Sequence, residues 1–236
     1  MKLLIVDSRI SDKCEASLLK EGYTLLKLPP DRSLGEAVCS HPDTVMFYLD
    51  GELITTADYC DCAPYIFSDI RELCPNIKIH FTADGRRTEY PWDCIMNALT
   101  VGNRIFCKSD TVSAVILDLA KRGGYEICHT KQGYPACSAL AFGNTLITAD
   151  RGLGGRAAEK GISVTLISQG GISLPPHEYG FIGGASGVVG RKIYFFGDIM
   201  SHPDGELICR VIKEAGYIPI SLSDEPLSDL GGIIAL

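Results

Sequence analysis

Four polar side chains recur at the same two distances before glycine-containing turns, and their types suit a site for a small polar molecule. Asp93 and Asn97 lie nine and five residues before one turn glycine, and Tyr134 and Ser138 lie nine and five residues before the next. A separation of four residues puts both members of a pair on the same face of a β-strand. A carboxylate, an amide and two hydroxyls that converge would hold and orient a polar ligand.

Cys137 adds a nucleophile to this set. A thiolate attacks an amidine or amide carbon when a neighbouring group moves protons, and Asp93 or His41 would have that role. Lys131 precedes the same segment and would pair with Asp93, which would orient a carboxylate or an amine. Cys137 and Ser138 face opposite sides if their strand is regular, so a hydrolase or transferase that uses Cys137 is one of several hypotheses.

The tripeptide His-Pro-Asp occurs twice, at 41–43 and at 202–204. The first copy opens a predicted core strand, so we expect His41 and Asp43 to reach the mouth of the same site. The second copy opens a predicted helix, where Asp204 would cap the positive end of the helix dipole.

Two further motifs suggest chemistry with less support. Cys60-Asp61-Cys62 lacks a second pair or a nearby histidine that would complete four metal ligands, so no metal site is predicted. The segment Gly152-Leu153-Gly154-Gly155-Arg156 follows a strand and opens a helix, which suggests phosphate binding. It lacks the full dinucleotide or P-loop pattern, and we predict no cofactor.

The candidate residues belong to a structural plan that the chain repeats four times. Each repeat has an apolar strand, a two-residue turn, a second apolar strand, a polar cap, a helix and a closing strand. Glycine and asparagine in such turns supply the positive φ angles that hairpins need. The turn glycines are 51, 41 and 47 residues apart, a period typical of propellers and repeat arrays. The turns are Asp50-Gly51, Gly102-Asn103, Gly143-Asn144 and Gly190-Arg191.

A fifth repeat fits across the two ends of the chain, because 46 residues follow Gly190 and 50 precede Gly51. Its hairpin strands would be 230–236 and 3–7. Their pairing would close five ββαβ modules into a five-bladed αβ-propeller without an exposed sheet edge. An open α/β sheet is the alternative. The 3.6-residue periodicity predicts helices near 13–21, 63–73, 110–122, 152–160 and 203–215.

Composition is that of one globular domain over residues 1–236. Hydrophobic residues make up 46% and charged residues 22% of the chain, and no apolar run reaches the length of a membrane span. The net charge of −7 argues against a nucleic-acid partner. The ten cysteines are scattered, and we expect reduced thiols and a cytoplasmic location. A homo-oligomer is compatible with the sequence.

The five-module plan resembles the pentein fold of the guanidino-group-modifying enzymes, and the resemblance covers nearly the whole chain. It implies that the strand before each turn lines an axial channel, where Gly183, Gly184 and Ser186 would let a ligand approach closely. The matching segments are Tyr90-Pro91-Trp92-Asp93, Lys131-Gln132-Gly133-Tyr134, Gly183-Gly184-Ala185-Ser186-Gly187, His202-Pro203-Asp204 and Asp229-Leu230-Gly231-Gly232.

The resemblance also implies a thiol nucleophile shortly after a Gly-Gly pair on the last core strand, with a histidine on an earlier one. Here the last segment reads Gly231-Gly232-Ile233-Ile234-Ala235-Leu236 without cysteine, and no histidine lies within 131–138. We therefore expect a protein that binds a small polar metabolite in the channel and does not modify guanidino groups. A non-catalytic scaffold or oligomer subunit is a further alternative.

Overall fold

The computed structural model describes residues 2–85 and 88–236. Over these residues it contains five three-stranded sheets of one design, in which an antiparallel hairpin is followed by a parallel third strand. The sheets consist of β3 (Met46–Leu49), β4 (Glu52–Thr56) and β5 (Lys78–Thr82); β6 (Ala98–Val101), β7 (Arg104–Cys107) and β8 (Glu126–His129); β9 (Ala139–Phe142), β10 (Thr145–Thr148) and β11 (Ser163–Leu166); β13 (Ser186–Val189), β14 (Lys192–Phe195) and β15 (Ile218–Ser221); and β17 (Ile234–Ala235), β1 (Leu3–Asp7) and β2 (Thr24–Leu28).

The fifth sheet joins the two ends of the chain. β1 pairs antiparallel with β17, with Leu4 opposite Ala235 and Ile5 opposite Ile234. The amide of Leu236 also donates to the carbonyl of Leu3 at 2.9 Å. The predicted pairing of the terminal strands is therefore confirmed, although β17 is shorter than the strand expected over 230–236.

The four predicted hairpin turns are also present, but their backbone conformation differs from the expectation in one respect. In the first turn both Asp50 and Gly51 have positive φ angles, of 49° and 82°. In the other three turns only the glycine does, and Asn103 and Asn144 do not share it. In these three turns, therefore, glycine alone supplies the left-handed residue that the hairpin requires.

A helix connects the second and third strands in each repeat, because a parallel pair needs a crossover. These helices are α1 (Asp12–Lys20), α3 (Ala57–Cys62) with α4 (Pro64–Leu73), α5 (Ala114–Arg122), α7 (Arg151–Glu159) and α8 (Gly205–Glu214). Each lies close to its predicted range. α5 begins four residues later than expected, because Ser113 caps it with a side chain that accepts from the amide of Val115.

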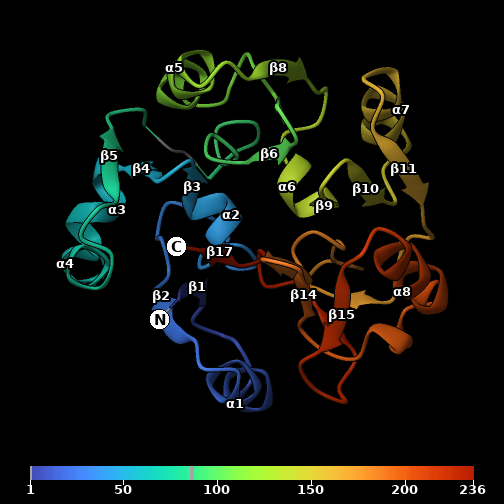
Figure 1. Ribbon diagram of the computed structural model, residues 1–236. Helices are drawn as coiled ribbons and strands as arrows, with labels where there is room; N and C mark the ends of the chain where they lie inside the picture. Colours follow the sequence, from blue (N-terminus) through green and yellow to red (C-terminus); the bar gives the residue numbers. More distant parts are fainter. Residues whose placement is uncertain (1, 86–87) are drawn as a thin grey trace.

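The sheets surround a common centre, with α1, α4, α5, α7 and α8 at the periphery and α2 (Pro42–Val45), α6 (Pro135–Ser138) and β17 toward the middle (Figure 1). Apolar clusters pack a sheet against its helix, as with Leu53, Ile66, Phe67 and Ile70, and they extend to the neighbouring repeat, as with Ile5 of β1. The remaining elements are the two-stranded parallel sheet of β12 (Ile172–Ser173) with β16 (Leu227–Ser228), and the 3-10 turn η1 (Ile199–Ser201). In the described part of the chain, no helix is long and apolar enough to span a membrane.

Candidate functional site

One residue from each repeat faces a single cavity of about 680 Å³ in the middle of the molecule, which we call the central cavity. Each of these residues lies five positions before the first strand of its sheet, that is, before β3, β6, β9, β13 and β17. Equivalent positions in a repeat project toward the same place, so residues far apart in sequence meet here. They are His41, Asp93, Tyr134, Phe181 and Asp229.

Short helical turns hold two of these positions, where the sequence predicted strand. Pro42 and Pro135 occupy the first positions of α2 and α6, where a proline fits because its missing amide would be unpaired there. The predicted strand face through Tyr134 and Ser138 is therefore wrong, and so is the one through Asp93 and Asn97, which lie in turns. In α6, Cys137 faces the central cavity while Ser138 faces a neighbouring one.

Asp93 and Tyr134 form a hydrogen-bonded pair on one wall. The Tyr134 hydroxyl donates to Oδ2 of Asp93. Burial, and then this bond to a carboxylate, raise the pKa of Tyr134, so the hydroxyl stays a neutral donor. The other carboxylate oxygen of Asp93, Oδ1, is buried without a hydrogen-bond partner. The pair thus leaves one acceptor oxygen for a ligand.

His41 also lines the central cavity and lies between two buried carboxylates. Its Nε2 is 3.8 Å from Oδ2 of Asp7, and its Nδ1 is 3.8 Å from Oδ1 of Asp229. Neither ring nitrogen makes a hydrogen bond. Burial lowers the pKa of His41 to about 4, so the ring is neutral at neutral pH. The charge of Asp7 is instead compensated by Arg9, whose Nη2 lies 2.6 Å from Oδ2.

Asp229 is a charged cavity residue that was not among the predicted site residues. Its Oδ2 accepts from the amide of Phe181 at 2.8 Å, and its Oδ1 accepts from the amide of Gly231 at 3.2 Å. Burial raises the pKa of Asp229 to about 7. A Cβ atom on Gly184 would lie 1.8 Å from Oδ1, so only glycine fits there. The spacing was informative, because Asp229 has the same offset from β17 that His41 has from β3.

Asp43, Asn97 and Cys137 form a buried layer under the central cavity. Nδ2 of Asn97 donates to Sγ of Cys137 at 3.2 Å and to the carbonyl of Asp43 at 3.0 Å. The Asp43 carboxylate faces the Cys137 thiol and the Asn97 amide, although neither oxygen completes a hydrogen bond of ordinary geometry. Burial raises the pKa of both Asp43 and Cys137 well above their usual values. The thiol is therefore protonated at neutral pH.

The remaining predicted site residues lie elsewhere. Lys131 is exposed and lines a separate cavity of about 630 Å³ beside α7, so the structure does not place it with Asp93. Gly183, Ser186 and Asp43 line a cavity of about 350 Å³ between the innermost strands. The Ser186 hydroxyl already donates to the carbonyl of Ile182 at 2.7 Å.

The structure also shows how the residues of the two weaker motifs, one considered for a metal and one for a phosphate, are arranged. Within residues 2–85 and 88–236, no group of three histidine, cysteine or acidic side chains is arranged to hold a metal ion. At the start of α7, Oδ1 of Asp150 accepts from the amides of Gly152 and Leu153, and its carbonyl accepts from Gly154. These amides are the ones that a phosphate would need, so the glycine-rich segment is an internally capped helix start.

Comparison with solved structures shows that the chain has the α/β fold of the pentein enzymes. A dimethylarginine dimethylaminohydrolase from Pseudomonas aeruginosa in complex with citrulline aligns with a TM-score of 0.58 at 12% identity, over 94% of this chain and 92% of that one. The agmatine deiminase of C. jejuni aligns with a TM-score of 0.56 at 9% identity, over 94% and 87%. An amidinotransferase from Microseira wollei aligns with a TM-score of 0.54 at 11% identity, over 89% and 72%.

The sequence also matches a family whose function is unknown. A family model described as "Family of unknown function (DUF6873)" matches residues 5–234. No curated protein matches the chain.

Proposed function

Because this chain belongs to the DUF6873 family of unknown function, no activity follows from its family, and we propose from the site itself that the protein binds a small organic cation in the central cavity. We further propose that it does not modify guanidino groups. The ligand would be an amine or amidine that enters among the five equivalent residues.

The observation that carries this proposal is the charge of the cavity wall. Asp93 and Asp229 line it, and among the described lining residues there is no lysine or arginine. A buried carboxylate without a cationic partner is costly, and a cationic ligand that reaches Oδ1 of Asp93 would remove that cost. The cavity of about 680 Å³ is within the usual range for small-molecule sites.

A second part of the proposal concerns how the five sheets are arranged around the central cavity. We propose that the five sheets form a closed five-bladed αβ-propeller and that the central cavity is one end of its axial channel. The pairing of β1 with β17 supports closure, and the common five-residue offset of the cavity residues supports a fivefold repeat. The cavity lined by the innermost strands would be the other end, separated from the first by Asp43, Asn97 and Cys137.

The named neighbours favour the same ligand class. Their names refer to dimethylarginine, agmatine and amidine transfer, and these compounds carry cationic guanidino or amidino groups. Residues 231–236 contain no cysteine, and the described cavity thiol is Cys137 in a different repeat. We therefore expect binding of such compounds without their conversion.

Calorimetric titration with agmatine, arginine and dimethylarginine tests the proposal. We expect at least one of them to bind, and Asp93→Asn to weaken that binding about tenfold, since a hydrogen bond to a charged group contributes roughly 1.5–3 kcal/mol. Asp69→Asn, an exposed position on α4, is the matched control and should leave affinity unchanged. Release of citrulline or ammonia above the buffer level would refute the absence of turnover, and failure of all three to bind would refute the ligand class.

A hydrolase or transferase that uses Cys137 is the second candidate, and one contact favours it. The Nδ2–Sγ hydrogen bond from Asn97 would stabilise a thiolate, and His41 lines the same cavity. A bound cation would lower the thiol pKa further, because it would offset the nearby carboxylates. Turnover of an amide or amidine that is lost in Cys137→Ser would select this candidate. A scaffold would bind none of these compounds.

A further inference from the structure

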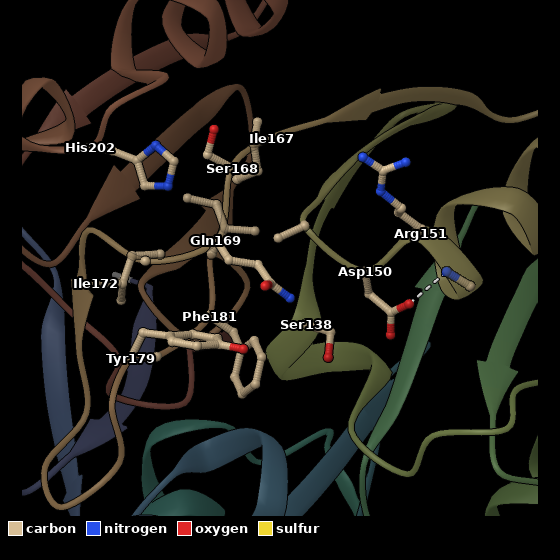
Figure 2. Close-up of a pocket in the computed structure, with 15 residues that line it drawn as sticks. Ser138, Asp150, Arg151, Ile167, Ser168, Gln169, Ile172, Tyr179, Phe181 and His202 are labelled. Carbon is tan, nitrogen blue, oxygen red and sulfur yellow. Dashed lines mark hydrogen bonds between the residues drawn. The ribbon is translucent and has the colours of Figure 1, made fainter.

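A second cavity, of about 540 Å³, lies between residues 149–152 at the start of α7 on one side and the segment 167–182 with His202 on the other. We call it the side cavity. Tyr179 and Phe181 line both it and the central cavity, and their rings pack edge to face with centroids 6.0 Å apart. Figure 2 shows the Tyr179 hydroxyl and the Gln169 amide directed toward its interior, and Ser138 lies at its edge.

His202 is a buried hydrogen-bond donor on the wall of this cavity without a partner. The residue is 3% exposed, and its Nδ1 accepts from the amide of Asp204 at 3.0 Å. In a neutral ring the proton is therefore on Nε2. Burial lowers the pKa of His202, which keeps the ring neutral. Nε2 has no hydrogen-bond partner. An unpaired buried donor costs about 1–3 kcal/mol, so an acceptor that enters the cavity would remove this cost.

The second His-Pro-Asp tripeptide holds this wall in place. Oδ2 of Asp204 accepts from the amide of Ser168 at 2.6 Å, rather than capping α8 as the sequence predicted. Gly171 follows with a φ angle of +73°, and a Cβ atom there would lie 2.7 Å from Cδ of Pro203. The segment 168–171 is thus fixed against His202 by a side chain and by close packing.

The charges and walls of the side cavity indicate the class of its ligand. Arg151 supplies a guanidinium from the first turn of α7, across the cavity from His202 (Figure 2). Asp150 also lines the cavity, and the amides of Gly152 and Leu153 at the start of α7, which donate to its Oδ1, offset part of its negative charge. The apolar part of the wall consists of Ile167, Ile172, Ile182 and Phe181.

From this arrangement we propose that the side cavity is a second binding site, distinct from the central cavity, for a small organic carboxylate. The carboxylate accepts from Nε2–H of His202, Arg151 provides the compensating positive charge, and the isoleucine wall contacts the carbon skeleton of the ligand. The proposal does not rest on the cation assigned to the central cavity, because none of these three contacts belongs to that site.

Nuclear magnetic resonance of the histidine rings tests this directly on the unmodified protein, with propionate and benzoate as probes and their amides, propionamide and benzamide, as uncharged controls. We expect His202 to show the Nε2–H tautomer and its Nε2 signal to shift on addition of at least one carboxylate. The matching amide should bind at least tenfold more weakly. An Nε2 signal that neither acid moves would overturn the proposal.

Variants then assign the contacts. His202→Phe and Arg151→Gln should each weaken binding of the carboxylate about tenfold or more, whereas His202→Gln retains a donor near Nε2 and should weaken it by about threefold or less. His80→Phe, which makes the same exchange on β5 outside both cavities, is the matched control. Equal binding by His202→Phe and the unmodified protein would overturn the site. Agmatine titrations of the same variants separate this outcome from failure of the central site.

Discussion

Asn97 donates a hydrogen bond to Sγ of Cys137 across 40 residues of sequence, with Nδ2 and Sγ 3.2 Å apart. The other end of the same amide accepts from the backbone of Ala136 at 2.8 Å. One side chain thus fixes both the start of α6 and the position of the thiol that α6 carries. The thiol nevertheless remains protonated, because its burial and the carboxylates of Asp43 and Asp229 outweigh this single bond.

Alkylation should therefore be slow at Cys137 in the empty protein. The raised pKa leaves little thiolate at pH 7.5, and the thiolate is the reactive form. Iodoacetamide labelling followed by peptide mass spectrometry measures this, with the exposed Cys62 as the internal reference. Agmatine should accelerate labelling if its charge stabilises the thiolate more than its bulk shields it. Labelling of Cys137 at the rate of Cys62 would contradict the burial argument.

Binding of a cation to the central cavity should become tighter as the pH rises toward 7. Asp229 has a pKa of about 7, so below that pH its carboxyl must lose a proton before it can attract a cation. The dissociation constant of agmatine should fall about tenfold per pH unit between pH 5 and 7. Titrations in buffers of different ionisation enthalpy should show the released proton. Asp229→Asn should bind more weakly with a flatter pH profile, and an unchanged profile would exclude Asp229 as the titrating group.

The pH dependence of stability should reveal two opposed groups. His41 is protonated near pH 4 in the folded state but near 6.5 in the unfolded chain, so its contribution falls as the pH drops from 6.5 to 4. Asp229 behaves oppositely, because its raised pKa makes its contribution largest below 3.8 and loses it as the pH rises through 7. Each group changes the free energy of unfolding by about 1.4 kcal/mol per pH unit between its folded and unfolded pKa values.

Denaturant unfolding of two variants separates these contributions. Relative to the unmodified protein, His41→Gln should gain stability as the pH falls from 6.5 to 4, whereas Asp229→Asn should lose it. Parallel slopes for both variants and the unmodified protein would show that neither group titrates as described.

Gly184→Ala should disrupt the central cavity through Asp229. The new Cβ would meet Oδ1 of Asp229 at 1.8 Å, so the carboxylate must move and release the amides of Phe181 and Gly231. We expect a loss of roughly 1–3 kcal/mol or more in the free energy of unfolding, and weaker agmatine binding. Gly155→Ala on α7 meets open space and should instead stabilise by roughly 0.5–1 kcal/mol. Equal thermal shifts for the two variants would contradict the packing argument.

The sequence by itself determined the repeat, its hairpins and helices, and the pairing of the terminal strands. The hairpins and helices depend on local signals such as turn glycines and apolar periodicity, which act over a few residues. The pairing of the terminal strands followed from the length of the repeat. It also identified His41, Asp93, Tyr134 and Cys137, which the structure brings to one cavity. Their binding and catalytic roles stay predictions.

Only the tertiary structure decided which of these side chains point into the central cavity. The helical turns α2 and α6 replace the expected strand. Because three residues are nearly one helical turn, Cys137 lines the same cavity as Tyr134, whereas a strand would put the two on opposite faces. Lys131 lies outside because it precedes this turn. Asp229 escaped prediction since its repeat is split between the chain ends, with no hairpin turn from which to count. Its convergence with His41 exists only once β17 pairs with β1.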